Sequence, residues 1–422
     1  MGKTEHGRIN DIIILEMNNM RCIDSIGEES ESFRRKIDMG EGLFGKIFGK
    51  SKKTESSFLG GDVVETVAAR ALGGELEKPM TLKFQKEGPL SETQNENKIY
   101  IKDNLIYKLV NQCTGGELDK KLQGTKNALG VTSSLTISKD TLLKFREVLK
   151  NEDLAKALQM SGSVAQVASL GVLVVAVGML KKANDQLGEL NTSVSRISDF
   201  QDAEYEGKVT TLIDDIQTVT EFQSEALKDK DNRSHELINL KNHEVKCIEL
   251  LNQANIIIKK EMEKERKSFK SYVDYTSNIE KWYQYQQILI LVLRQISELR
   301  LTLNLGVVSR ENSYSNYNKN IPRIIDVRKA LRDWHMQNIG FYNVDLKEKK
   351  HKRVGGVFDA AKRIPIGVLA NKISEDTVSD DMIRFIENQT KEDYDKLKAG
   401  SANQFEQDVK MVVEDGKLYY VS

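Results

Sequence analysis

The chain has 422 residues, of which 39% are hydrophobic, 30% are charged and 7% are aromatic. This polar composition suits long amphipathic helices with narrow apolar faces, and the scarcity of aromatic residues argues against a large β-sandwich. Lysine plus arginine and aspartate plus glutamate each number 63, which gives a formal net charge of zero. Because proteins that bind nucleic acid usually carry a basic excess, we expect no nucleic-acid partner.

Residues 1–60 form a mixed N-terminal segment in which charged and glycine-rich stretches surround a short basic, apolar run at 42–53. Phe44 and Phe48 are four residues apart and lysines follow them, so a short helix here could lie in a membrane interface. A surface loop fits the same residues. The apolar run at 12–15 is too short for the core of an export signal, which predicts a cytoplasmic or membrane-associated protein without a signal peptide.

Residues 61–135 carry the clearest strand signals in the first half of the chain. Apolar residues alternate with polar ones at 98–102 and at 105–110, with Asp103 and Asn104 between the two runs, which predicts a hairpin. Residues 80–84 alternate in the same way and predict a third strand. We therefore expect a small α+β region here.

Residues 136–308 predict a long helical hairpin, because no proline interrupts the chain between Pro89 and Pro322. The polar run at 228–234 is the expected reversal, so two arms of about 70 residues would lie antiparallel. A coiled-coil spacing of three and four residues recurs at Leu187, Leu190, Val194 and Ile197.

An uncharged segment at 157–180 lies in the first arm, with Lys156 before it and Lys181 and Lys182 after it. A helix that is apolar all round must be buried in a protein core or in lipid, and lysines at its ends suit a membrane interface. Both environments stay open for this segment. Its candidate membrane-inserting residues are Val164, Val167, Leu170, Val172, Leu173, Val174, Val175, Val177, Met179 and Leu180.

Residues 321–422 predict a C-terminal helical region that ends in a second hairpin. Strand-like runs at 409–413 and 418–421 flank Asp415-Gly416, and glycine supplies the positive φ that a tight hairpin turn needs. The expected fold class is therefore mainly α: an elongated antiparallel bundle of long coiled-coil helices, with a small α+β region near the N-terminus and a short C-terminal β-hairpin.

No pattern of catalytic or metal-binding residues emerges from the chain. The run at 45–51 ends in Gly-Lys-Ser, but it has three residues between its glycines where a phosphate-binding loop has four, and no strand precedes it. The five histidines and three cysteines do not cluster at metal-ligand spacing. We expect no enzyme activity, catalytic residue, metal or cofactor.

The layout of residues 138–305, with long antiparallel helices and an uncharged segment near one helix end, resembles the α-helical pore-forming toxins of the cytolysin A and haemolysin BL type. The resemblance rests on layout and on no family motif, so it assigns no functional residue. It implies a helical bundle that hides an apolar segment, releases it at a membrane and assembles into a ring. The chain departs from the family by its missing export signal and its continuous apolar segment.

Two functions follow as hypotheses. The first is a membrane-active helical protein, such as a pore-forming toxin or an effector of bacterial defence. It would insert 157–180 conditionally into the lipid bilayer and oligomerise through its coiled coil. The second is a soluble coiled-coil scaffold or adaptor with 157–180 in its core. Its partner would be a second copy of the chain or another helical protein.

Overall fold

A computed structural model describes residues 74, 76–126, 132–149, 154–197, 203–221, 227–265, 267–347, 350–351, 376–392, 394–397 and 403–421. The predicted interfacial segment at 42–53, with Phe44 and Phe48, lies outside the described residues, as does the run at 45–51. All described residues belong to one unit, Thr66–Ser422.

Most of the described residues are helical. The shorter α-helices are α4 (Glu92–Glu96), α5 (Asn104–Cys113), α6 (Glu117–Lys126), α7 (Lys139–Leu149), α8 (Leu154–Gln159), α14 (Arg310–Ser313) and α17 (Asp380–Thr390). The longer ones are α9 (Val164–Ser195), α10 (Ala203–Glu221), α12 (Lys230–Glu263), α13 (Phe269–Leu303) and α15 (Ser315–Tyr342). Two 3-10 turns, η2 (Tyr394–Leu397) and η3 (Gln404–Glu406), lie near the C-terminus.

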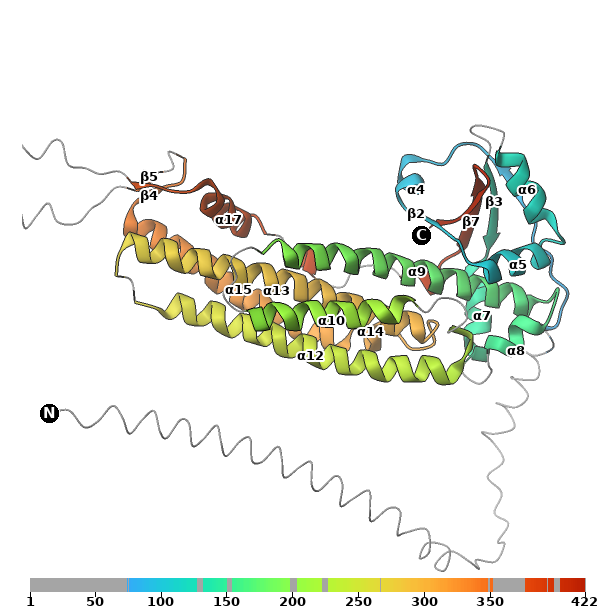
Figure 1. Ribbon diagram of the computed structural model, residues 1–422. Helices are drawn as coiled ribbons and strands as arrows, with labels where there is room; N and C mark the ends of the chain where they lie inside the picture. The colour runs from blue at the N-terminus through green and yellow to red at the C-terminus, as the bar shows by residue number, and fades with distance from the viewer. Residues whose placement is uncertain are drawn as a thin grey trace, which may run out of the picture. The chain divides into compact units, whose positions relative to one another are not determined.

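The long helices pack side by side into a bundle (Figure 1). Helix α9 packs on α10 and α13, α12 packs on α10 and α13, and α15 packs on α12 and α13. The predicted helical bundle is therefore confirmed. The prediction of two arms of about 70 residues is wrong, because the described residues of that stretch form four long helices, α9, α10, α12 and α13, preceded by the shorter α7 and α8.

A reversal between α12 and α13 accounts for much of this difference. The connection contains neither proline nor glycine, and the sequence marks it only by a run of charged residues that ends at Ser268. The hydroxyl of Ser268 accepts a hydrogen bond of 3.1 Å from the Ser271 N–H, which caps the first turn of α13. The predicted reversal at 228–234 coincides with the start of α12, where Asp229 is the N-cap.

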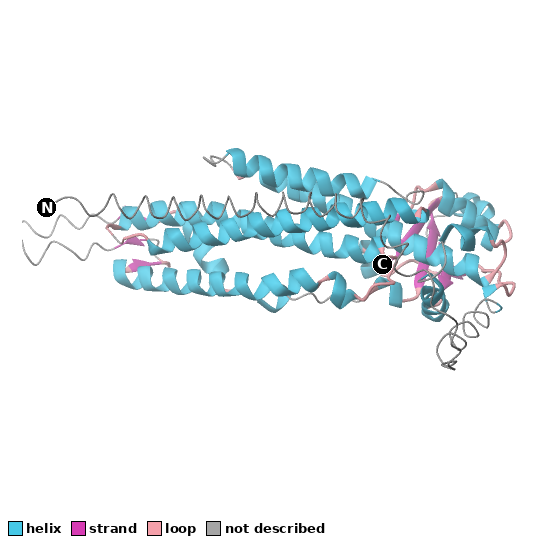
Figure 2. Ribbon diagram, turned by 90° about the horizontal axis from the view of Figure 1, so that it is seen from below, coloured by secondary structure: helices cyan, strands magenta, loops and turns pink. Residues whose placement is uncertain are grey.

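A five-stranded antiparallel sheet lies at one end of the long helices (Figure 2). Its order is β1 (Gln85–Glu87), β3 (Thr132–Ile137), β7 (Val409–Glu414), β8 (Lys417–Val421) and β2 (Lys98–Tyr100). Helices α4, α5 and α6 lie beside this sheet (Figure 1). A second, three-stranded sheet joins β4 (Val344–Asp345), β5 (Lys350–His351) and β6 (Asp376–Thr377).

The predicted C-terminal hairpin is confirmed as β7 and β8, with Glu414 paired to Lys417. Asp415 and Gly416 form its turn with φ angles of 49° and 70°, the left-handed conformation that a two-residue hairpin turn requires. The hairpin completes the sheet begun by the N-terminal strands, since β7 pairs with β3 and β8 pairs with β2.

The prediction of a hairpin at 98–110 is wrong in its second half. Residues 98–100 form β2, but 104–113 form α5, which Asp103 caps by accepting a 3.0 Å hydrogen bond from the Ile106 N–H. The buried residues of α5 recur at helical spacing, so the same apolar residues satisfy a helix as well as a strand. The strand predicted at 80–84 is also wrong, because β1 begins only at Gln85.

Candidate functional site

The apolar segment singled out by the sequence is divided between two helices. Helix α8 ends at Gln159 and α9 begins at Val164, so the expectation of one continuous segment over 157–180 is wrong. Gly162 adopts a φ of 72°, a conformation natural to glycine, and the Ser163 hydroxyl accepts a 3.2 Å hydrogen bond from the Gln166 N–H. These two residues end one helix and start the next.

The start of α9 is tied to a distant part of the chain. The Val164 N–H donates to the Lys78 carbonyl at 3.0 Å, and the Met80 N–H donates to the Gly162 carbonyl at 2.9 Å. The Gln166 amide also donates to the Gln112 side chain of α5 at 3.2 Å. The apolar helix therefore begins at a fixed point between α5 and the segment before β1.

Helix α9 is, among the described helices, the one long and apolar enough to cross a bilayer, with a mean hydropathy of 1.9 over its most apolar 18 residues. In the structure 83% of that window is buried. Val164 and Met179 are half-buried and pack against the core. The other candidate membrane-inserting residues are buried: Val167, Leu170, Val172, Leu173, Val174, Val175, Val177 and Leu180.

Helix α9 is covered by elements that precede it in the chain and by the C-terminal strands. Helices α5, α7 and α8 and strands β2, β3, β7 and β8 contact it, in addition to α10 and α13. A Cβ added to Gly178 would lie 2.5 Å from Cδ1 of Tyr420, and one added to Gly171 would lie 2.6 Å from Cδ2 of Leu142. The two glycines thus allow the sheet and α7 to approach the helix closely.

The lysines at the end of the apolar segment have different environments. Lys181 is half-buried, and its ammonium donates a 3.0 Å hydrogen bond to the Tyr100 carbonyl of β2. Lys182 is exposed. Beyond them, the predicted coiled-coil residues Leu187, Leu190, Val194 and Ile197 are buried. Contacts with α10 flank this stripe, including a 2.8 Å hydrogen bond from Asn191 to Asp214.

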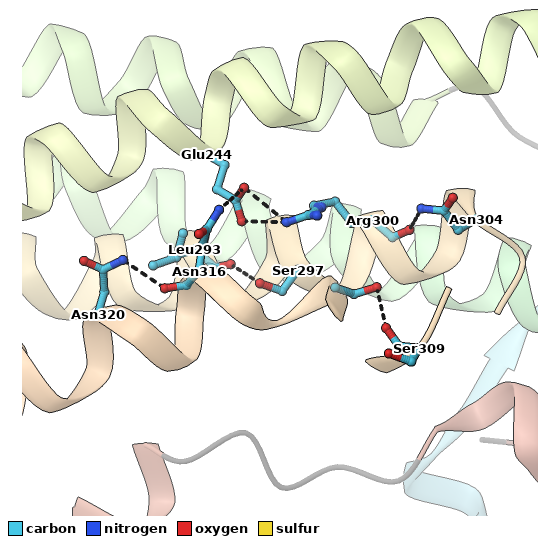
Figure 3. A network of polar contacts seen from close by, with 9 residues as sticks. Glu244, Leu293, Ser297, Arg300, Asn304, Ser309, Asn316 and Asn320 are labelled. Atoms are coloured by element: carbon cyan, nitrogen blue, oxygen red, sulfur yellow. Dashed lines mark hydrogen bonds and ion pairs between the residues drawn. The ribbon is translucent and has the colours of Figure 1, made fainter. Parts of the chain in front are cut away.

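A buried polar layer joins three helices of the bundle (Figure 3). The carboxylate of Glu244 on α12 accepts hydrogen bonds of 3.0 and 3.1 Å from Nη1 of Arg300 on α13. It also accepts a 2.7 Å hydrogen bond from the Asn316 amide of α15. Because the Glu244 side chain is only 2% exposed, these donors replace the water that the carboxylate has lost.

The buried thiols and imidazoles are poorly suited to catalysis. Cys113 and Cys247 are free and buried, and burial raises the pKa of Cys113 to about 11, so its thiol stays protonated. Burial lowers the pKa of His335 to about 3, which keeps that ring neutral beside the Tyr272 hydroxyl, 3.0 Å away. Within the described parts of the chain, no three His, Cys, Asp or Glu side chains gather to hold a metal ion.

The outward face of α12 exposes three branched apolar side chains: Ile238 is 61% exposed, Val245 51% and Ile256 52%. Eighteen residues make five turns, so Ile238 and Ile256 point the same way, and Val245 deviates from them by about 20°. The sequence analysis missed this stripe because its three residues are far apart, at intervals of seven and eleven residues. Other apolar residues of α12 lie between them, on the faces that are buried in the bundle.

The buried polar residues were missed as well. Glu244 stands between Leu240 and Cys247 on the buried face of α12, and Gln389 follows Phe385 and Ile386 on the buried face of α17. Their only signal in the sequence is a polar residue in phase with apolar ones. No family model, curated protein or solved structure matches this chain.

Proposed function

We propose that this chain is a non-enzymatic helical interaction protein that pairs with a second copy of itself along α12. The observation that supports this proposal is the exposed stripe of Ile238, Val245 and Ile256 on one helix face. A row of apolar residues on an outward helix face is the pattern that a second helix covers in helix–helix packing.

The two isoleucines of the stripe are complementary to each other in an antiparallel arrangement, in which Val245 lies opposite Glu249. Ile238 and Ile256 are equally far from position 247, and so are Asn242 and Asn252. A two-fold axis at 247 would place Ile238 of one copy against Ile256 of the other, and Asn242 against Asn252. Apolar pairs of this kind supply contact, and paired asparagines fix the register of two helices.

Ile238→Lys and Ile256→Glu test this pairing. Each variant alone is expected to shift the protein to monomer, because each places a charge against an isoleucine in both halves of the symmetric interface. Mixed together, the two variants are expected to form a heterodimer, since antiparallel pairing sets the new lysine against the new glutamate and the two remaining isoleucines against each other. Sedimentation velocity measures both results.

The control is Met336→Lys on α15, where the side chain is 53% exposed and lies outside the stripe. This variant is expected to keep the wild-type association state. A wild-type protein that is monomeric at every concentration tested would contradict the proposal, and so would association that Ile238→Lys leaves unchanged. A mixture that stays monomeric would contradict the antiparallel register.

A membrane-active protein is the second candidate, supported by the length and hydropathy of α9. In this proposal the helix leaves its cover at a bilayer, as the resemblance to the cytolysin A and haemolysin BL type implies. We rank it below the interaction protein because the apolar part of α9 is already covered by protein, which satisfies an all-round apolar helix without lipid.

Tyr420→Ala separates the two candidates. The Tyr420 ring is 3% exposed and packs on Gly178, so its removal is expected to lower the free energy of unfolding by about 3 kcal/mol. If α9 is released at membranes, loosening its cover will increase flotation with anionic vesicles and the leakage of trapped dye. If α9 is a permanent core helix, stability falls while the vesicles stay sealed and free of protein, which is the result we expect.

A further inference from the structure

A cavity of about 300 Å³ lies between β2, α9 and α10. Its polar lining consists of Lys102, Lys181, Asn184, Asp185 and Thr220, and Tyr100 forms part of its wall. A volume of this size is at the lower end of the range of small-molecule sites. No residue of the exposed α12 stripe lines the cavity, so a ligand bound here would be a function additional to the proposed pairing.

Three lysines lie around the ring of Tyr100. The ammonium nitrogens of Lys102 and Lys417 are 5.5 Å from the ring centre, and that of Lys181 is 5.7 Å from it. No two of these nitrogens can therefore be more than about 11 Å apart, so their mutual repulsion is only partly screened at physiological ionic strength. Within the described part of the chain none of the three lysines forms an ion pair, and a bound anion would relieve the repulsion.

The acidic groups nearby do not balance these lysines. Glu414 is engaged by Lys98 at 2.6 Å, and Asp103 caps the first turn of α5. Asp185 is the one carboxylate in the lining of the cavity, and its side chain is exposed. The lining therefore carries two cations and one carboxylate, in a chain whose formal net charge is zero.

The polar lining also has more hydrogen-bond donors than acceptors. An ammonium group has three N–H donors, and Lys181 uses one of them for the 3.0 Å hydrogen bond to the Tyr100 carbonyl. Lys102 makes no hydrogen bond to the other described residues. The amide oxygen of Asn184 accepts a 2.9 Å hydrogen bond from the Thr220 hydroxyl, which leaves the N–H groups of this amide for a ligand. A ligand that fits this lining is therefore rich in acceptors.

The kind of cation distinguishes phosphate from carboxylate. The planar fork of arginine matches a planar carboxylate, whereas the ammonium group of lysine acts as a point charge with rotatable donors and is a common phosphate binder. The lining contains lysines and no arginine. Tetrahedral phosphoryl groups, which present oxygens in several directions, suit such donors better than a carboxylate does.

We propose that this cavity binds the diphosphate group of a small ligand. One phosphoryl group accepts hydrogen bonds from Lys181 and Asn184, and the other pairs with the exposed Lys102. Lys417, on β8, adds attraction from the far side of the Tyr100 ring without lining the cavity. Free diphosphate and a nucleoside diphosphate share this chemistry.

Inorganic pyrophosphate is the first probe, and malonate is its planar dicarboxylate counterpart. Isothermal titration calorimetry of the full-length protein at 0.15 M salt, where the screening length is about 8 Å, is expected to detect pyrophosphate and to find malonate at least about tenfold weaker. Adenosine diphosphate separates the two sources of the group. Tighter binding than pyrophosphate assigns the site to a nucleotide, and equal or weaker binding assigns it to free diphosphate.

Substitutions in the lining test which residues hold the ligand. Lys102→Gln changes an exposed side chain, so the protein is expected to stay folded while pyrophosphate binding weakens about tenfold, the usual effect of losing a charged hydrogen bond. Lys181→Met keeps a similar side-chain length and is expected to weaken binding at least as much. Asp185→Asn removes a repelling carboxylate and is expected to strengthen binding about threefold.

Lys182→Gln is the matched control, because it removes the same charge from the next residue of α9, which lines a different cavity beside α13. It is expected to leave the pyrophosphate affinity unchanged within about threefold. Absence of pyrophosphate binding to the wild-type protein would overturn the proposal, as would equal affinity for malonate. An equal effect of Lys102→Gln and Lys182→Gln would also overturn it, since that result indicates non-specific attraction to lysines.

Discussion

Val174→Asp is expected to lower the free energy of unfolding by about 4 kcal/mol or more, enough to unfold much of the protein. The Val174 side chain is fully buried in the middle of the apolar part of α9. An aspartate there would either bury an unpaired charge or force the helix away from its neighbours, and both are among the most destabilising changes known. Urea denaturation followed by circular dichroism measures the effect.

Val245→Asp is the matched control, since it makes the same chemical change on α12 at a side chain that is 51% exposed. Because Val245 belongs to the proposed pairing stripe, all the proteins are unfolded at a concentration at which the wild type is monomeric. The effect of Val245→Asp on the unfolding of the monomer is expected to stay within about 0.5 kcal/mol, apart from a small difference in helix propensity. If Val174→Asp unfolded at the same urea concentration as Val245→Asp, α9 could not lie in the core as described.

Arg300→Met is expected to destabilise the bundle by about 3–5 kcal/mol, because it leaves the buried carboxylate of Glu244 without its main charged partner. The amide of Asn316 remains as a neutral donor at 2.7 Å but supplies no positive charge. The double variant Glu244→Gln with Arg300→Met is expected to recover part of this loss, because a neutral amide is much easier to bury than a carboxylate. Chemical unfolding of the single and double variants measures the coupling.

An exposed ion pair provides the comparison. Lys391 and Glu387 lie 3.2 Å apart with side chains 72% and 45% exposed, so Lys391→Met is expected to change stability by less than about 1 kcal/mol. If Arg300→Met were no more harmful than Lys391→Met, or if the double variant were less stable than Arg300→Met alone, the polar layer in Figure 3 would not contribute as argued.

Local sequence patterns were sufficient for several elements of the fold. The Asp415-Gly416 pair marked the turn of the C-terminal hairpin, and the spacing of Leu187, Leu190, Val194 and Ile197 marked a buried helical stripe. These features depend on residues that are close together in the chain, so periodicity and turn chemistry identify them.

Elements that depend on distant residues could not be predicted in this way. The sequence gives no sign that β7 and β8 complete a sheet with β2 and β3, although this sheet supplies part of the cover of α9. Without knowledge of that cover, the sequence leaves open whether the all-round apolar helix lies in a protein core or in lipid. The sequence analysis likewise placed Asp103 in a hairpin turn rather than at the N-cap of α5, because the apolar residues that follow it fit a strand as well as a helix.

The candidate sites also differ in whether they depend on residues that are close together or far apart in the chain. The apolar residues of α9 were identified from the sequence because they are continuous along it. The exposed stripe on α12 and the buried amide of Gln389 can be recognised only once the elements that pack around them are known. Gln389 is an ordinary helix residue in the sequence, and becomes notable only because its buried amide has no hydrogen-bond partner among the described residues.

Whether α9 stays in its protein core when a bilayer is present decides between the two proposed functions, and hydrogen exchange measured by mass spectrometry tests it most directly. The full-length protein would be compared alone and with anionic vesicles, following the amides of β2, β7 and β8, which cover α9. We predict the same protection of these strands in both samples. Loss of their protection when vesicles are added would show that the cover opens at a membrane, and would contradict the account of α9 as a permanent core helix.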